Sequence, residues 1–211
     1  MRKLNRATVT APACLASYAH GRNNWGDVSH AHKQEIRDSL DQMQGRRCAY
    51  CEGPLDTLGQ HIEHFRRKSR FVHLTFAWAN LFSSCDQNDS CGHFKDHGAG
   101  PYNPDDLLDP CADDPSLFLR FRSDGTVDVR PGLAQRDEFR ARETLRVFNL
   151  HMEFGRLRNM RKQVASAYLS TVDELATWNA ADRRDYAQQE IQATASEPFS
   201  TVVRHMFEGV L

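Results

Sequence analysis

The chain has 211 residues, of which 40% are hydrophobic and 26% are charged, and its formal net charge at pH 7 is -1. This composition is typical of a globular protein with a buried core, and it excludes a strongly basic field over the whole molecule. Any hold on nucleic acid must therefore come from a local basic patch or from a partner. No apolar signal-like stretch follows the start and no eighteen apolar residues run together. We therefore expect a cytoplasmic protein without a membrane partner.

Residues 1–45 are predicted to form an arm followed by one helix. The first 26 residues show no clear periodicity, so we expect an irregular arm there. Ser29 is a typical N-cap and Gly45 a typical stop, and three apolar residues between them recur at helical spacing. These three are Ile36, Leu40 and Met43. An amphipathic helix is predicted between the two boundary residues.

Residues 46–98 contain short segments separated by turn residues, and four of the six cysteines lie there. Cys48 and Cys51 form a CxxC, whose two-residue spacer lets a tight turn bring both thiolates to one ion. Cys85 and Cys91 complete a four-sulfur set, which in a reducing compartment favours metal ligands over disulfides. The alternatives are a redox pair or chance, but no βαβ pattern accompanies the motif. A closed structural zinc site is predicted.

Residues 99–211 are predicted to form an acidic loop, a short hairpin and a helical region. The hairpin is expected at about 117–130 and turns at Asp124 and Gly125. Apolar residues from Phe154 to Leu175 share one face of a long predicted helix. Further helices are expected from about Asp182 to Ala195 and from Ser196 onward. These segments define three parts of the chain, 1–45, 46–98 and 99–211, and an α+β fold class.

A carboxylate and several imidazoles lie between and beside the two cysteine pairs. The segments read H-I-E-H at 61–64, W-A-N-L at 78–81 and C-G-H-F-K at 91–95. Hydrolysis of a phosphodiester needs a base for water and a cation for the developing charge. Carboxylate and imidazole accept Mg²⁺, Mn²⁺, Ni²⁺ or Zn²⁺ as a catalytic ion. In an extended segment His61 shares a face with Glu63 while His64 points away, so His61 is either a second metal ligand or a substrate contact.

The run from Cys48 to Lys95 resembles the HNH endonuclease family. In that family a ββα-metal core places one His on a first strand, an Asn in the next loop or strand and another His on a helix. The resemblance implies that His64 is the base and that Glu63 and His93 hold one divalent ion. It also implies that Asn80 orients His64 or the backbone around it. Taken singly, each residue has an ordinary alternative, such as a turn cap for Asn80.

Basic residues follow the expected base directly, in the segment F-R-R-K-S-R at 65–70. This segment is the best local candidate for phosphate contact, with an ordinary charged loop as the alternative. Its cations are Arg66, Arg67, Lys68 and Arg70. Lys95 either contacts phosphate or forms the solvated flank of a helix.

A narrower resemblance extends over roughly residues 30–165. It rests on R-C-A-Y-C-E, I-E-H-F-R-R-K-S, L-T-F-A-W-A-N-L-F-S-S-C, C-G-H-F-K-D and T-L-R-V-F-N-L-H, with N-P at 103 and 104. These segments resemble the PtuB-like HNH subunit of Septu-type and retron-associated anti-phage systems, although Arg67 stands where that family commonly has proline. The resemblance implies a zinc-stapled core with helical elaborations at both ends, a nucleic-acid substrate with DNA favoured over RNA, and an ABC-type ATPase partner.

Two other functions remain open on the sequence. One is a stand-alone HNH endonuclease of the restriction or homing type, and the other is a non-catalytic zinc-stapled adaptor that binds nucleic acid or protein. The arginine-rich segment at 156–162 would bind nucleic acid, dock the ATPase or form a solvated helix face. Cleavage by the isolated chain separates the first rival from the defence effector, and loss of cleavage on removing His64 separates either from the adaptor.

Overall fold

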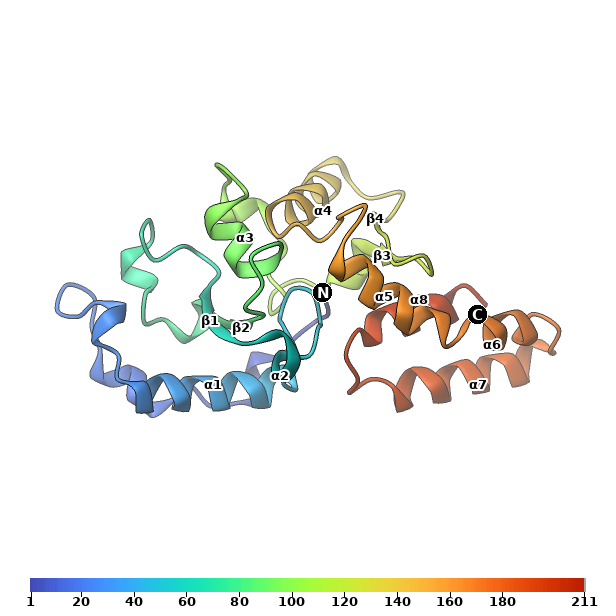
Figure 1. Ribbon diagram of the computed structural model, residues 1–211, viewed down its shortest axis with the longest axis horizontal. Coiled ribbons are helices and arrows are strands. Elements are labelled where there is room, and N and C mark those ends of the chain that lie inside the picture. The colour runs from blue at the N-terminus through green and yellow to red at the C-terminus, as the bar shows by residue number, and fades with distance from the viewer. Residues whose placement is uncertain (211) are drawn as a thin grey trace.

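The computed structural model describes residues 1–210 as a mixed α+β protein with two separate antiparallel hairpins (Figure 1). The predicted α+β class is confirmed. The helices are α1 His30–Gln44, α2 Leu55–Leu58, α3 Cys91–His97, α4 Gln135–Val147, α5 Arg156–Ser166, α6 Leu169–Leu175, α7 Ala180–Ala193 and α8 Ser200–Glu208. The strands are β1 His61–His64, β2 Leu81–Ser84, β3 Leu119–Phe121 and β4 Val127–Val129. In this described part of the chain, no helix is long and apolar enough to span a membrane.

Helix α1 begins and ends where the sequence predicts. The Ser29 hydroxyl accepts a backbone N–H of the first turn, and Gly45 ends the helix in the left-handed region at φ 63°. A residue with a Cβ would be strained at that φ, so glycine suits this end. Ile36 and Leu40 are fully buried. The apolar face of α1 therefore packs against the core beside β2.

The N-terminal arm is more regular than expected. It forms three short 3₁₀ turns, at Arg6–Thr8, Ala13–Ser17 and Trp25–Asp27. Leu4 and Leu15 are buried in the main core. The Arg6 guanidinium donates to the backbone carbonyls of Trp78 and Leu81, at 2.8 and 3.0 Å. The expectation of an irregular arm was therefore wrong in part, because apolar and guanidinium contacts hold it against the β1–β2 hairpin.

Strands β1 and β2 pair antiparallel and precede helix α3, which gives the order ββα. The register places His61 opposite Ser84 and His64 opposite Leu81. All four residues of β2 are buried, whereas the first half of β1 is partly exposed. The hairpin therefore presents the residues at the start of β1 toward α3 and the surface.

The second hairpin, β3–β4, confirms the prediction for residues 117–130. Gly125 lies in its turn at φ +84°, a conformation that favours glycine. A Cβ at this position would collide with the backbone carbonyl of Arg158 in α5. The turn of the hairpin therefore needs glycine for its conformation and for its close approach to α5.

The C-terminal helices differ from the prediction in three ways. The single helix expected from Phe154 to Leu175 is broken into α5 and α6, and the break lets Leu175 bury against Phe207 in a second small core. Helix α8 begins at Ser200, after Phe199 adopts a left-handed conformation, rather than at Ser196. Helix α4 was not predicted. The helices α5 to α8 gather at the opposite end of the molecule from the start of α1 (Figure 1).

Candidate functional site

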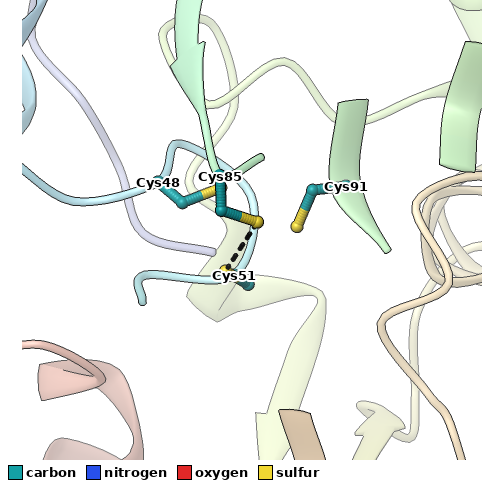
Figure 2. A group of neighbouring side chains, drawn as sticks. All are labelled: Cys48, Cys51, Cys85 and Cys91. Atoms are coloured by element: carbon teal, nitrogen blue, oxygen red, sulfur yellow. Dashed lines mark hydrogen bonds between the residues drawn. The ribbon is translucent and has the colours of Figure 1, made fainter. Parts of the chain in front are cut away.

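Four cysteines from three segments meet beside the first hairpin. Cys48 and Cys51 lie in the turn before α2, Cys85 follows β2 directly, and Cys91 is the first residue of α3. All four are buried, and their sulfur atoms lie within 4.8 Å of one another. Figure 2 shows the side chains converging, with Cys51 Sγ 3.9 Å from Cys85 Sγ. The structure therefore brings together the full predicted set.

The geometry and chemistry of this four-cysteine cluster fit zinc. Tetrahedral Zn²⁺ with Zn–S bonds of about 2.3 Å separates its sulfurs by about 3.8 Å. Burial raises the pKa of Cys48, but hydrogen bonds from the other three thiols bring it well below its usual value. Hydrogen bonds with Cys48 and Cys51 raise the pKa of Cys85, and burial raises the pKa of Cys91. The first negative charge of the cluster therefore lies on Cys48. All four cysteines are free of disulfides, so the cluster is consistent with a zinc-binding site.

A buried arginine supplies positive charge beside the cluster. Arg161 is 1% exposed, and its Nη1 donates to the Leu150 carbonyl at 2.6 Å. Within residues 1–210 it forms no ion pair with a carboxylate. Burial lowers the pKa of Arg161 to about 10, and the negative charges of Cys51 and Cys91 act in the opposite direction. A zinc ion with four thiolates carries a net charge of -2, which a buried cation partly balances.

The neighbouring Arg156 also turns toward this region. It donates to Asp89 Oδ1 at 2.8 Å and to the Ser90 hydroxyl at 3.1 Å, immediately before the last cysteine. The sequence predicted that Arg156 and Arg161 lie on a surface that binds nucleic acid, docks a partner or is simply solvated. Arg161 is instead part of the interior, because its guanidinium faces the cluster and the Phe121 ring at 4.8 Å.

A second group of metal-binding side chains lies where β1 meets α3. His61, Asp86 and His93 offer ligand atoms that all lie within 4.8 Å of one another. The rings of His61 and His93 are stacked with centroids 4.0 Å apart, and His93 Nε2 is 2.6 Å from Asp86 Oδ1. Glu63 Oε2 approaches His61 Nε2 at 3.4 Å. The predicted residues Glu63 and His93 and the uncertain His61 therefore share one neighbourhood.

Asp86 is the residue of this group that sequence reasoning missed. It follows Cys85 directly, so the cysteine that belongs to the four-cysteine cluster also fixes the position of this carboxylate. A hydrogen bond with His93 lowers the pKa of Asp86, which keeps it ionised near neutral pH. The sequence shows only that an acidic residue follows a predicted metal ligand. Without the fold, nothing in the sequence indicates that Asp86 lies near His61 and His93. Imidazole and carboxylate together suit a divalent ion.

Gly92 leaves open the space between the two side chains of β1 that face α3. A Cβ at this position would lie 2.6 Å from Glu63 Oε2 and 2.8 Å from His61 Nε2. Both distances are shorter than van der Waals contact, so a side chain here must displace one of the two groups. The backbone of α3 at Gly92 therefore approaches the Glu63 and His61 side chains as closely as glycine allows.

The substitution Gly92→Ala is expected to weaken binding of Mn²⁺ at this group by about tenfold or more, because the added methyl occupies the space between Glu63 and His61. Calorimetric titration of the zinc-loaded protein with Mn²⁺ measures the effect. Gly26→Ala is the matched control, since no atom lies within 4 Å of a Cβ built there. Equal Mn²⁺ affinity in the Gly92 variant and the parent would show that His61 and Glu63 do not hold the ion.

Lys95 is an interior residue and not a solvated flank of α3. It is fully buried, and its Nζ lies 2.7 Å from Glu63 Oε1 and 2.5 Å from Asp96 Oδ1. Burial lowers the pKa of Lys95, but Glu63 and the groups around it raise it above the usual value. The ammonium is thus charged and turned toward Glu63. Because Lys95 is buried and paired with Glu63, the phosphate contact that the sequence left open for Lys95 gains no support. The ion pair also fixes Glu63 with its second oxygen toward His61.

His64 lies on the other side of β1 from Glu63. Its side chain is buried, and Nε2 donates to the Thr75 carbonyl at 3.0 Å. The Trp25 ring meets the imidazole edge to face, with centroids 4.5 Å apart. Burial lowers the pKa of His64 to about 4, with Lys68 as the next contribution. The imidazole is therefore neutral at pH 7, and the donation from Nε2 leaves Nδ1 as the nitrogen that can accept a proton.

Asn80 fixes the loop that leaves β1. Its Oδ1 accepts from the Arg66 backbone N–H at 2.7 Å, and its Nδ2 donates to the carbonyls of Arg66 and Leu74, at 3.0 and 3.2 Å. Asn80 is buried, so these bonds are shielded from water. The side chain touches the backbone just beyond His64 and not the imidazole itself. This geometry is what a positioning role for Asn80 requires, and the role stays a prediction.

The predicted phosphate patch is divided by its ion pairs. Arg66 pairs with Asp105 at 2.5 Å and Arg67 pairs with Asp96 at 2.9 Å. Lys68 and Arg70 are exposed, and neither forms an ion pair within the described residues. Of the four cations, these last two are therefore the ones available to an external anion.

The fold and the two clusters define an α+β protein with a buried four-cysteine site consistent with zinc and a His–Asp–His group that suggests a catalytic centre. No family model matches the chain. It is 28% identical over 149 residues to the Septu protein PtuB of Bacillus mycoides (strain KBAB4), and the aligned residues cover 57% of this chain and 48% of that relative. It is 29% identical over 103 residues to the Septu protein PtuB of Bacillus thuringiensis, and the aligned residues cover 48% of this chain and 36% of that relative.

The chain is thus a distant homologue of Septu protein PtuB, and the predicted resemblance is confirmed at that level. The matched region amounts to about half the length of the first relative and less of the second.

Proposed function

We propose that this chain is a metal-dependent HNH endonuclease that hydrolyses phosphodiester bonds of nucleic acid. The observation that carries the proposal is the group of His61, Asp86 and His93 beside Glu63, within 4.8 Å for the first three and close in the chain to the buried His64. Two imidazoles and two carboxylates suit a divalent ion. They are not needed by the zinc site, whose four positions are filled by thiolates, so they indicate a second metal site.

The roles follow from the chemistry of each group. His64 is neutral at pH 7, so it takes a proton from the attacking water through the nitrogen not bonded to Thr75. His61, Asp86 and His93, with Glu63, would hold a divalent ion such as Mg²⁺ or Mn²⁺. When bound, that ion supplies positive charge for the phosphate oxygens and lowers the pKa of water. Lys95 pairs with Glu63 and fixes its carboxylate in position.

The three parts of the chain take different roles in this proposal. Residues 46–98 form the catalytic core with its structural zinc. Residues 1–45 and 99–211 support that core, since Arg6 donates to the backbone at Trp78 and Leu81 from one side and Arg161 lies beside the four-cysteine cluster from the other. These contacts from both sides give a structural reason for the segments that precede and follow the small ββα unit.

We further propose that the chain acts in bacterial anti-phage defence, as the effector of a complex with an ABC-type ATPase. The homology to Septu protein PtuB supports this context. The net charge of -1 also fits it, because an effector that shares its substrate contacts with a partner needs no strongly basic surface of its own. Activity of the isolated chain on duplex DNA without any partner would favour a stand-alone endonuclease instead.

The test compares His93→Ala with His97→Ala on labelled DNA and RNA, with and without added Mg²⁺ or Mn²⁺. His97 is exposed on the same helix, and its ring lies 6.4 Å from that of His93, so it controls for loss of a nearby imidazole. We expect cleavage only with added metal, and a rate on the order of 10² lower in the His93 variant. The assay is run with the chain alone and with the product of the neighbouring reading frame, for which the proposal expects an ABC-type ATPase. Equal cleavage by His93→Ala and the parent would contradict the metal assignment.

A further inference from the structure

A cavity of about 570 Å³ opens beside residues that contact His64. Residues 20–26 of the N-terminal arm form one wall, and part of the loop after β1 forms the other. Two lining residues, Trp25 and Thr75, are the same two that contact the His64 imidazole. The cavity therefore borders the Trp25 ring and the Thr75 backbone that contact the proposed base.

The charge of this cavity is positive. Arg22 and Lys68 lie in its lining from opposite walls, His20 adds an imidazole, and no lining residue is acidic. Arg22 and Lys68 are exposed, and neither pairs with a carboxylate among residues 1–210. This differs from Arg66 and Arg67 in the same loop, whose charges are met by Asp105 and Asp96. The fold thus keeps two cations free where the arm and the loop face each other.

Apolar and amide groups line the same space. Trp25 is partly exposed, and Val72 is 48% exposed at the loop wall although it is a large hydrophobic residue. Asn24 and Ser69 add polar side chains. A site for phosphate alone needs only cations, whereas a nucleoside also needs an aromatic or apolar face and hydrogen-bonding groups for its base. The mixed lining and the volume both match one nucleotide.

We propose that this cavity binds one unpaired nucleotide of the substrate strand, next to the phosphodiester on which His64 acts. The phosphate of that nucleotide lies between Arg22 and Lys68, and its base packs on Trp25. The inference rests on the proposed function for the identity of the bond that is cut, but the binding site itself stands on the cavity. It gives the N-terminal arm, which lies outside the ββα core, a share in substrate selection.

The test measures binding of a 5′-labelled single-stranded DNA oligonucleotide to the zinc-loaded chain by fluorescence polarisation, without added divalent metal, so that no cleavage occurs. The double substitution Arg22→Ala with Lys68→Ala is expected to weaken binding about tenfold or more, and to reduce the dependence of log K on log salt by about 0.7, the value for one phosphate contact on a single strand. Trp25→Leu, which keeps apolar bulk against His64, should weaken binding about fivefold or more.

Arg184→Ala is the matched control, an exposed arginine of α7 at the opposite end of the molecule (Figure 1). We expect it to bind as the parent does. A duplex of the same sequence should compete about tenfold more weakly than the single strand, because its bases are paired and stacked. Equal competition would overturn the assignment to an unpaired nucleotide.

The outcomes separate the cavity from the catalytic proposal. Unchanged affinity and salt dependence in the Arg22 and Lys68 double variant would overturn the nucleotide site, even if His93→Ala abolishes cleavage. If the parent cuts nothing with any metal or partner, while its binding still depends on Arg22, Lys68 and Trp25, the nucleotide site stands and the endonuclease proposal fails.

Discussion

Replacing Cys85 by serine is expected to release the ion of the four-cysteine cluster and to unfold the ββα core. Structural zinc contributes an apparent free energy of about 10 kcal/mol or more, which is comparable to the total stability of about 5–15 kcal/mol of most domains. Cys85 is fully buried and follows β2 directly, so the loss also frees the end of that strand. Zinc content by atomic emission should fall from one ion per chain, and circular dichroism should show loss of the cooperative thermal transition.

Cys111→Ser is the control for this substitution, because Cys111 is a free, partly exposed cysteine outside the cluster. It should retain one zinc ion and the thermal transition of the parent. A Cys85 variant that keeps its fold and melts at the temperature of the parent would show that the four cysteines do not form a structural metal site. Retention of fold with loss of zinc would reduce the cluster to a metal site without a stabilising role.

The four-cysteine cluster was predictable because its information is local. A two-residue spacer brings Cys48 and Cys51 together in any tight turn, and a second pair in the same part of the chain has few other uses in a reducing compartment. Helix α1 was predictable for a similar reason, since Ser29 and Gly45 act on the turns next to them. These features depend on residues that are close in sequence, so a local pattern is enough to predict them.

The environment of Glu63 was not predictable in the same way. Its partner Lys95 lies far along the chain, and the two meet only because the register of β1 with β2 sets the position of α3. Asp86 joins His61 and His93 through that same register. A lysine two residues after a histidine on a helix is compatible with solvent or with burial, and sequence pattern alone gives no reason to choose between them.

Basic residues show the same limit. The segment at 65–70 contains four cations in the sequence, but Asp105 and Asp96 neutralise Arg66 and Arg67 in the fold. Conversely, Arg22 and Lys68 are distant in the sequence and face one cavity. Counting charges along the chain therefore predicted a continuous patch, whereas the distribution of free charge depends on which carboxylates the tertiary structure brings close.

The break between α5 and α6 has a comparable origin. Periodicity from Phe154 to Leu175 is compatible with one long helix, and the residues that interrupt it are Ala167 and Tyr168, which carry no strong helix-breaking signal. Their backbone N–H groups bond three residues back, which tightens the chain and redirects Leu175 toward Phe207. Burial in the second core decides this geometry, and burial depends on α8.

His64→Ala is expected to lower the rate of phosphodiester cleavage by about 10² to 10⁴, the usual contribution of a general base. The zinc content and the thermal transition should stay close to those of the parent, because His64 contacts Trp25 and Thr75 and lies apart from the four-cysteine cluster. Oligonucleotide binding should also persist, since the cations proposed to hold the phosphate are unchanged. Single-turnover cleavage at saturating protein, with metal added, isolates the chemical step from binding.

The control is His73→Ala, which removes an exposed imidazole from the same loop region without touching His64. We expect it to cleave at the rate of the parent. If His64→Ala retains zinc, fold and binding and still cleaves as fast as the parent, His64 is not the base. If cleavage is lost while Mn²⁺ binding at the His–Asp–His group is unchanged, the base and the metal site act as separate parts of one centre. That result would match their positions on opposite sides of β1, with Lys95 and Gly92 on the metal side and Trp25 on the other.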